Sequence, residues 1–266
     1  MNKAHSELKR LCQSLRLPAV YDALSIQERS PEFQSMTTIE CINDALIRQF
    51  ELNAEKKIER LQKAALLRWP QATLMDFKGK AIPVAFKHLL EFAQGKWLED
   101  NLHIGITGPT GSGKTHLGCG IANELLMNQI PVLYVHYHRL IQRLKAAEKA
   151  GDDDLEKLMR KYTKVRVLFI DDWGMQPLTA CERRLLFDLI EQRDQKGSLI
   201  VTSQYDIGDW QSAFSDKTVA DSIIDRIIHY FIHIDWNDVS QRQTIGSKLV
   251  AKNTPRMATK TPKGAK

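Results

Sequence analysis

The chain lacks the features that mark secreted, zinc-binding and membrane-spanning proteins. Its 266 residues include only four cysteines, Cys12, Cys41, Cys119 and Cys181, and no two of them form a C-x-x-C pair. This spacing gives neither a disulfide framework nor a zinc site. No apolar run approaches the ~20 residues that a membrane-spanning helix needs, and no apolar segment follows the basic start. We therefore expect a folded protein of the cytoplasm with reduced cysteines.

The N-terminal part of the chain contains no glycine before Gly79. Leucine and isoleucine recur there at helical spacing instead. Pro18 and Pro31 divide this pattern into separate helices. We predict an N-terminal helical domain over residues 1–68, followed by a proline-containing connector over residues 69–83.

Short apolar segments alternate with helix-length stretches in the rest of the chain. Each segment is almost continuously apolar, which is typical of strands in a parallel sheet that helices cover on both faces. The predicted strands are 104–107, 132–135, 167–170, 199–202 and 231–234. We predict an α/β core over residues 84–245, with a parallel sheet flanked by helices.

The excess of positive charge is concentrated in the last residues. The formal net charge is +6 at pH 7, and five basic residues without an acidic neighbour lie after residue 250. These are Lys252, Arg256, Lys260, Lys263 and Lys266. We predict that residues 246–266 form a disordered basic tail, which either adds sequence-independent attraction to phosphate backbones or only increases solubility.

A glycine-rich turn leads from the first predicted strand into a helical pattern. The stretch GPTGSGKT matches the phosphate-binding pattern G-x-x-x-x-G-K-[ST]. Its glycines allow successive amide N–H groups to surround an anion, and the following helix directs its positive end to the same point. Lys114 is placed to contact the β- and γ-phosphates, and the Thr115 hydroxyl to ligate Mg²⁺. We predict ATP and Mg²⁺ as cofactors, with the nucleotide held by Gly108, Pro109, Thr110, Gly111, Ser112, Gly113, Lys114, Thr115 and His116.

Polar residues after two later strands provide the second half of a catalytic site. Asp171 and Asp172 follow an apolar strand, at the carboxyl end where ligands bind in open α/β sheets. We predict that Asp171 associates with the metal, directly or through water, and that Asp172 orients the attacking water. Gln204 follows the next strand and is predicted to hydrogen-bond that water or the γ-phosphate, with a polar strand-end turn as the alternative.

Four stretches of the sequence resemble one family of ATPases. They are GPTGSGKT, LFIDDWG, LIVTSQYDIGDW and ADSIIDRIIHYF, in this order and spacing. They resemble the IstB family, the ATPase helpers of insertion-sequence transposases, which is related to the helicase loader DnaC and the initiator DnaA. The resemblance extends from the N-terminal helices to about residue 245, and DDWG followed by PLTACERR is its most specific part. It implies an AAA+ P-loop core with an N-terminal helical domain and no C-terminal lid domain.

The resemblance also assigns roles to two arginines. Arg226 lies where related ATPases present an arginine to the γ-phosphate held by a neighbouring subunit. From the residues alone, Arg226 is a helix-surface arginine paired with Asp225 or Asp221. Arg242 occupies the position of a second arginine near the nucleotide, although its surroundings depart from the family pattern. The role of Arg226 implies that hydrolysis requires a homo-oligomer.

Basic side chains form two stripes on the helix predicted after the second strand. Arg139 and Arg143 share one face, and Lys145 and Lys149 form a neighbouring stripe. In related ATPases this region follows the DNA backbone, so all four are predicted phosphate contacts, with a solvated helix face as the alternative. A second and weaker set consists of Lys56, Lys57, Arg60, Lys63 and Arg68. Because the sequence has no base-reading motif, we expect binding to be largely sequence-independent.

The resemblance implies an ATP-dependent DNA-binding regulator of transposition. Copies of the chain are expected to join through bound ATP into a spiral or ring-like homo-oligomer on duplex DNA. This assembly would bend the DNA and recruit or activate a transposase, with the N-terminal helices making higher-order contacts. The alternatives are a DnaC-like helicase loader and a P-loop small-molecule kinase. A non-enzymatic DNA-binding module would leave the nucleotide site without a purpose.

Overall fold

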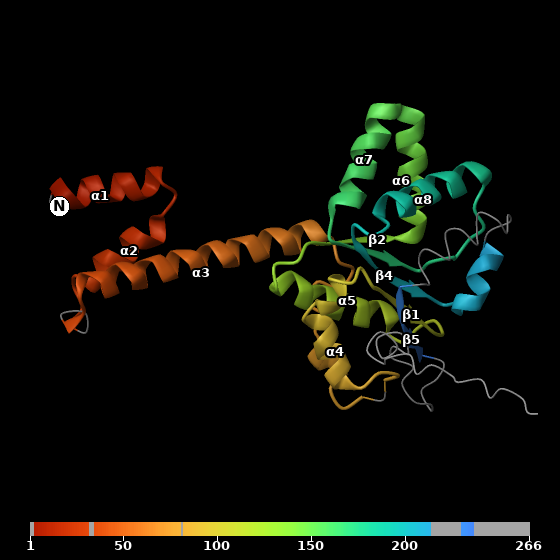
Figure 1. Cartoon of the computed structure of the whole chain (residues 1–266), viewed down its shortest axis with the longest axis horizontal. Coiled ribbons are helices and arrows are strands. Elements are labelled where there is room, and N and C mark those ends of the chain that lie inside the picture. Colours follow the sequence, from red (N-terminus) through yellow and green to blue (C-terminus); the bar gives the residue numbers. More distant parts are fainter. Residues whose placement is uncertain (1–2, 32–34, 81, 214–229, 237–266) are drawn as a thin grey trace, which may run out of the picture. The chain divides into compact units, whose positions relative to one another are not determined.

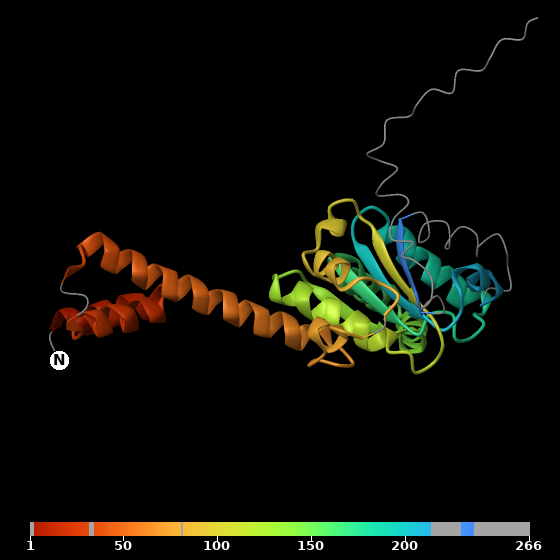
Figure 2. The same ribbon diagram turned by 90° about the horizontal axis from the view of Figure 1, so that it is seen from below.

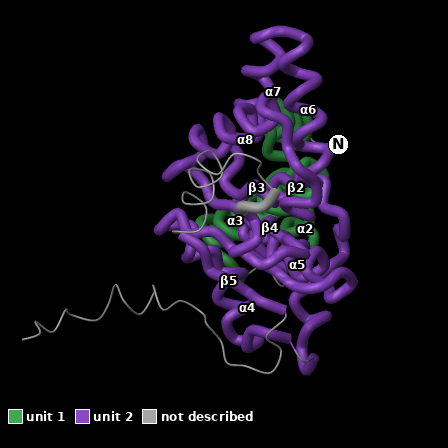
Figure 3. Tube along the Cα trace, turned by 90° about the vertical axis from the view of Figure 1, so that its right-hand side faces the viewer, with its two compact units in different colours: residues 1–64 green, residues 65–266 purple. Residues whose placement is uncertain are grey.

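The computed structural model describes residues 3–31, 35–80, 82–213 and 230–236. The chain divides into two compact units, Met1–Ala64 (unit 1) and Ala65–Lys266 (unit 2), which are coloured separately in Figure 3. Every helix in the described ranges is too short or too polar to cross a membrane. The predicted basic tail, residues 246–266, lies outside the described residues, and so do the last residues of the predicted core, 237–245. The domain limits stated from the sequence stay predictions.

Unit 1 is helical, as the sequence predicts. Its helices are α1 (Lys3–Ser14), α2 (Pro18–Gln27) and α3 (Thr38–Ala65), whose last residue belongs to unit 2. Pro18 begins α2, where its missing N–H group leaves no hydrogen bond unmade. Gln27 joins α2 to α3 by donating a hydrogen bond of 2.7 Å to the carboxylate of Asp44. On α3, Ile39 is 80% exposed and Phe50 is 74% exposed, so unit 1 presents a large apolar surface.

Five parallel strands form one sheet in the described part of unit 2 (Figure 1). Their order is β2-β3-β4-β1-β5, and they lie side by side in the view of Figure 2. The strands are β1 (His103–Thr107), β2 (Val132–His136), β3 (Val167–Asp171), β4 (Ser198–Ser203) and β5 (Phe231–Asp235). Each coincides with a predicted segment, so the predicted parallel α/β core is confirmed.

Helices cover both faces of this sheet. They are α4 (Phe86–Ala93), α5 (Lys114–Met127), α6 (Tyr137–Ala150), α7 (Asp152–Lys164) and α8 (Ala180–Arg193). In Figure 1, α6, α7 and α8 lie on the upper side of the strands, and α4 and α5 lie on their lower left side. Leu133, Ile170 and Val201 pack with α6, α7 and α8, whereas Phe169 packs against Gly118 of α5. The core therefore has two apolar layers with the sheet between them.

The segment between α3 and α4 packs closely on α5. It contains the 3-10 helix η2 (Leu74–Phe77), in which Leu74 and Phe77 are buried. Asn123 of α5 donates hydrogen bonds to the carbonyl oxygens of Pro70 and Ala72, at 3.1 and 2.8 Å. These contacts hold the segment against the helix that follows the glycine-rich turn.

Candidate nucleotide site

The carboxyl ends of three neighbouring strands meet at one edge of the sheet. β1 ends at Thr107 and leads into the glycine-rich turn, β3 ends at Asp171, and β4 ends at Ser203. Thr107 pairs with Ser203 in the register of β1 and β4. Because β4 lies between β1 and β3, the turn, the two aspartates and Gln204 lie at one edge, where open α/β sheets bind ligands.

The glycine-rich turn is shaped to bind an anion. Gly111 and Gly113 have φ angles of +82° and +98°, which residues with side chains rarely adopt. α5 begins at Lys114, so the first amide N–H groups of a 14-residue helix lie at the turn. Within the described residues, the buried hydroxyl of Ser112 has no hydrogen-bond partner. A bound phosphate would satisfy these donors.

Lys114 is held inside the turn. Its side chain is buried, and Nζ donates hydrogen bonds to the carbonyl oxygens of Gly108 and Pro109, at 2.7 and 2.8 Å. Burial lowers the pKa of Lys114, while the negative charges of Asp172 and Asp171 act in the opposite direction. The amine therefore lies where a phosphate bound in the turn would contact it. A phosphate is a charged acceptor and would bind the amine more strongly than the two carbonyl oxygens do.

Asp171 is fully buried at the end of β3 and accepts hydrogen bonds from three hydroxyl groups. Thr115 and Tyr134 donate to it at 2.7 Å each, and Thr202 donates to the same carboxylate. A carboxylate beside a threonine hydroxyl is the hard-oxygen donor set that suits Mg²⁺. The described residues contain no cluster of three His, Cys, Asp or Glu residues.

The sequence does not predict three of the contacts that Asp171 makes. Tyr134 comes from β2, and burial together with the charge of Asp171 raises the pKa of this phenol, so it keeps its proton and donates a hydrogen bond to the carboxylate. In the sequence, Thr202 is recognisable only as the polar residue at the end of a predicted strand. Arg68 lies 3.7 Å from the Asp171 carboxylate, although the sequence grouped it with the basic N-terminal residues. No spacing rule connects Arg68 with Asp171, because tertiary packing brings them together.

Asp172 adopts an unusual backbone conformation beside the site. Its φ angle is +60°, which is uncommon for a residue with a side chain. Two contacts stabilise this conformation. Its N–H donates to the Thr202 hydroxyl at 3.0 Å, and its carboxylate lies 3.2 Å from Nε2 of His136. His136 ends β2 and also caps α6 by accepting a hydrogen bond from the His138 N–H. It therefore connects α6 with the carboxyl ends of the strands, where the candidate nucleotide site lies.

Gln204 contacts the glycine-rich turn directly. The Thr110 hydroxyl donates a hydrogen bond of 2.9 Å to its side-chain oxygen, and its amide nitrogen donates to the sulfur of Met175. The structure therefore brings Gln204 beside the glycine-rich turn, and its hydrogen bond to the γ-phosphate or the attacking water stays a prediction.

Aromatic rings border the other side of the turn. His116 bonds to the carboxylate of Asp76 at 2.8 Å, and its ring lies 5.7 Å from that of Phe77 and 6.1 Å from that of Trp69. The ring of Trp236, at the end of β5, is 6.4 Å from that of Phe77. A Cβ atom at Gly113 would lie 3.8 Å from the Trp236 ring, so this ring reaches the phosphate turn. The side chain of His116 thus faces aromatic residues and Asp76.

The four predicted DNA contacts on α6 have different surroundings. Arg139, Arg143 and Lys149 are exposed, and no carboxylate within the described residues pairs with either arginine. Lys145 instead forms an ion pair of 2.9 Å with Glu182 of α8. Leu140 and Leu144 are buried on the opposite side of the helix.

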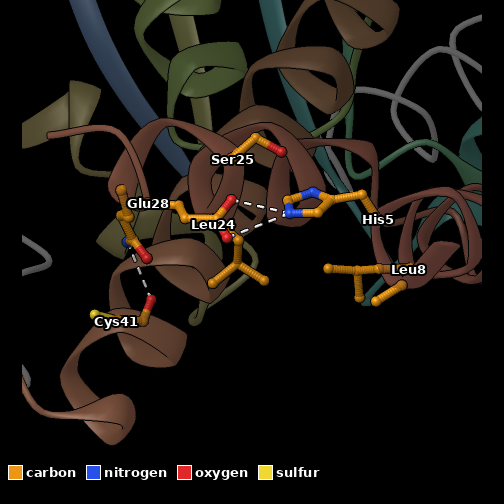
Figure 4. Close-up of a pocket in the computed structure, with 8 residues that line it drawn as sticks. His5, Leu8, Leu24, Ser25, Glu28 and Cys41 are labelled. Atoms are coloured by element: carbon orange, nitrogen blue, oxygen red, sulfur yellow. Dashed lines mark hydrogen bonds and ion pairs between the residues drawn. The ribbon is translucent and has the colours of Figure 1, made fainter. Parts of the chain in front are cut away.

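The remaining candidates lie elsewhere. Arg226 and Arg242 are outside the described residues, so their roles stay predictions. Unit 1 has a cavity of its own, of about 410 Å³, between its helices (Figure 4). Its lining is mostly apolar, and His5 and Glu28 form an ion pair of 2.9 Å beside it. Nothing in that cavity has the chemistry of a nucleotide site.

Comparisons with known proteins agree with this geometry. The family model for IstB-like ATP binding proteins matches residues 10–248. An insertion sequence ATP-binding protein of Sinorhizobium fredii (strain NBRC 101917 / NGR234), y4pL, is 29% identical over 241 residues, which cover 90% of this chain and 97% of that protein. The ATP-binding protein of insertion sequence IS1162 from Pseudomonas fluorescens is 31% identical over 191 residues, covering 71% and 82%. The crystal structure of the DnaC helicase loader matches with a TM-score of 0.56 and 22% identity, over 64% of this chain and 98% of that one. This likeness confirms the AAA+ P-loop fold.

Proposed function

Because the chain belongs to the family of IstB-like ATP binding proteins, we propose that it is an ATP-dependent regulator of transposition that assembles on duplex target DNA. The chain is an AAA+ ATP-binding protein of the insertion-sequence type. In our proposal, the assembly is a homo-oligomer that bends the DNA and recruits or activates the transposase of the same mobile element. The observation that carries the proposal is the meeting of the phosphate turn, Asp171 and Gln204 at one sheet edge, next to the basic helix α6.

We assign each residue at this edge a separate task. Lys114 and the amide N–H groups of the turn bind the phosphates. Thr115 and Asp171 would hold Mg²⁺, which neutralises charge on the β- and γ-phosphates when it is bound. Asp172 orients the attacking water, with its side chain positioned by His136, and Gln204 contacts that water or the γ-phosphate.

Base binding is assigned to the aromatic side of the turn. We propose that the adenine ring of ATP lies against the ring of Trp236, which packs beside the buried Phe77, because an aromatic surface beside a phosphate site suits a planar base. Arg226, in this proposal, reaches the γ-phosphate of a neighbouring subunit, so that hydrolysis requires assembly. DNA binding is assigned to Arg139, Arg143 and Lys149 on α6 and is expected to be largely sequence-independent.

The ATPase rate with and without duplex DNA tests this function against its alternatives. We expect duplex DNA to stimulate hydrolysis, and dilution to a monomer to abolish it. A small-molecule kinase would hydrolyse ATP at a rate that neither DNA nor dilution changes. Co-purification with a transposase supports the proposed role, whereas co-purification with a replicative helicase would support a helicase loader instead.

A further inference from the structure

A cleft beside the edge strand β2 is lined by basic side chains. Its volume is about 560 Å³, and Arg68, Arg139, Arg143 and His136 lie around it. Tyr134 forms part of the same wall. None of the residues that line the cleft is acidic, so three permanently charged guanidinium groups share one concave surface.

Two of these arginines, Arg139 and Arg143, have no carboxylate partner among the described residues. Arg139 has no ion-pair partner among the described residues, and Arg143 has only a long contact of 3.5 Å to the Tyr162 hydroxyl. Cations that share a cleft repel one another, and an anion bound between them relieves this repulsion. Guanidinium groups bind phosphate oxygens through paired hydrogen bonds, so phosphate is the ligand chemistry that fits.

One of the three arginines reaches the nucleotide site. Arg68 is 51% exposed on the side of the cleft, yet its guanidinium lies 3.7 Å from the fully buried carboxylate of Asp171. Tyr134 links the same two regions, because it lines the cleft and donates a hydrogen bond to Asp171. Two side chains, Arg68 and Tyr134, therefore connect the cleft with the predicted metal carboxylate.

We propose that the cleft binds a backbone phosphate of duplex DNA, and that this phosphate draws Arg68 away from Asp171. This inference rests on the proposed function. Arg68 and Mg²⁺ compete for the same carboxylate, since two cations close to one carboxylate repel each other. A phosphate in the cleft gives Arg68 another partner and leaves Asp171 to the metal. DNA in the cleft and Mg²⁺-nucleotide at the turn therefore favour each other, and the coupling is reciprocal.

The arrangement of the cations favours a nucleic-acid backbone over a free phosphate ion. Arg139 and Arg143 lie about one helical turn apart along α6, so their backbone positions are about 6 Å apart along the helix axis. A row of cations suits a polyanion, which can occupy several of them at once and release several counterions.

The test measures the affinity for a non-hydrolysable ATP analogue with Mg²⁺, with and without duplex DNA. For the unmodified chain we expect DNA to raise this affinity about tenfold, within the usual range of coupling between sites. In Arg68→Gln, the affinity without DNA should already be raised and DNA should add little. Arg68→Lys keeps the charge and should keep part of the coupling. Arg160→Gln, on the exposed face of α7, removes an arginine outside the cleft and should behave like the unmodified chain.

Four results would overturn the inference. Arg68→Gln could keep the full effect of DNA, or it could lower the affinity without DNA, which would mean that Arg68 serves the phosphates of the nucleotide itself. Inorganic tripolyphosphate could replace DNA, which would assign the cleft to a free phosphate. DNA could still raise the affinity for the ATP analogue by the full amount in the double variant Arg139→Gln, Arg143→Gln, which would mean that DNA does not bind in the cleft. Thermal melting of each variant verifies folding, and failure of the unmodified chain to bind nucleotide or DNA at all would reject the proposed function as well.

Discussion

At the scale of single residues, Asp171 shows how the fold prepares a carboxylate for a metal ion. Removing a carboxylate from water is costly unless hydrogen bonds and positive charge replace the lost hydration. Thr115, Tyr134 and Thr202 provide the hydrogen bonds, and Arg68 provides the charge. A bound cation would therefore find a carboxylate that is already oriented.

His103 makes the stability of unit 2 depend on pH. It is buried at the start of β1, and its Nδ1 accepts a hydrogen bond from the Leu199 N–H at 3.3 Å. Burial, assisted by the charge of Arg193, lowers the pKa of His103 from 6.5 to about 4. The unfolded chain therefore binds a proton at a higher pH than the folded chain does. The stabilisation is complete above pH 6.5 and is lost as the pH falls toward 4.

Chemical unfolding at several pH values tests this contribution. Between pH 7 and pH 4 the free energy of unfolding should fall by up to about 3 kcal/mol more in the unmodified chain than in His103→Asn. Asparagine keeps an acceptor for the Leu199 N–H but does not titrate. Parallel pH profiles for the two proteins would contradict a buried neutral His103.

At the scale of secondary-structure elements, α6 joins the proposed DNA-binding surface to the proposed nucleotide site. His136 caps the helix and contacts Asp172, and the basic residues follow on the exposed side. Lys145 is distinct within this set because Glu182 holds its ammonium group at 2.9 Å, and this contact raises the pKa of Lys145. A lysine that is already paired contributes less to phosphate binding than an unpaired arginine does.

DNA affinity measured over a range of salt concentrations distinguishes these residues. Arg139→Ala should weaken duplex binding and reduce the salt dependence by about one counterion, as expected for the loss of one phosphate contact. Lys145→Ala should have a smaller effect on both quantities. Lys157→Ala, on α7, serves as a control for the loss of one positive charge outside α6. A larger loss in Lys145→Ala than in Arg139→Ala would contradict this assignment.

The elements themselves could be predicted because their signals are local. Each strand is a short and nearly continuous apolar run, and GPTGSGKT marks the turn between β1 and α5. The contacts within the site were only partly predictable. Asp171 and Thr115 could be paired by their known motif, whereas Arg68, Tyr134 and His136 reach the site only through packing between distant segments. Nothing in the spacing of these residues indicates such contacts.

At the scale of the whole molecule, the proposed function requires that copies of the chain act together. Every described contact of Lys114 and Asp171 lies within one unit 2, whereas the proposed role of Arg226 requires a second subunit. If Arg226 completes the site of a neighbour, hydrolysis depends on assembly, because an isolated subunit then lacks the charge that stabilises transfer of the γ-phosphate.

Mixing two inactive variants tests this division of labour. Arg226→Ala should bind ATP nearly normally but should not hydrolyse it, and Lys114→Ala should fail to bind ATP while keeping Arg226. In a mixture, Arg226 of the second variant can complete the nucleotide site of the first, so turnover should exceed that of either variant alone. Normal turnover in Arg226→Ala by itself would reject the interfacial role.

Sedimentation of a labelled DNA duplex with the purified chain tests the central claim most directly. With a non-hydrolysable ATP analogue and Mg²⁺, we expect the duplex to sediment as a large complex that contains several copies of the chain. Without nucleotide, or with Lys114→Ala, the duplex should sediment almost as free DNA. Large complexes of equal size under all three conditions would contradict an assembly that ATP holds together.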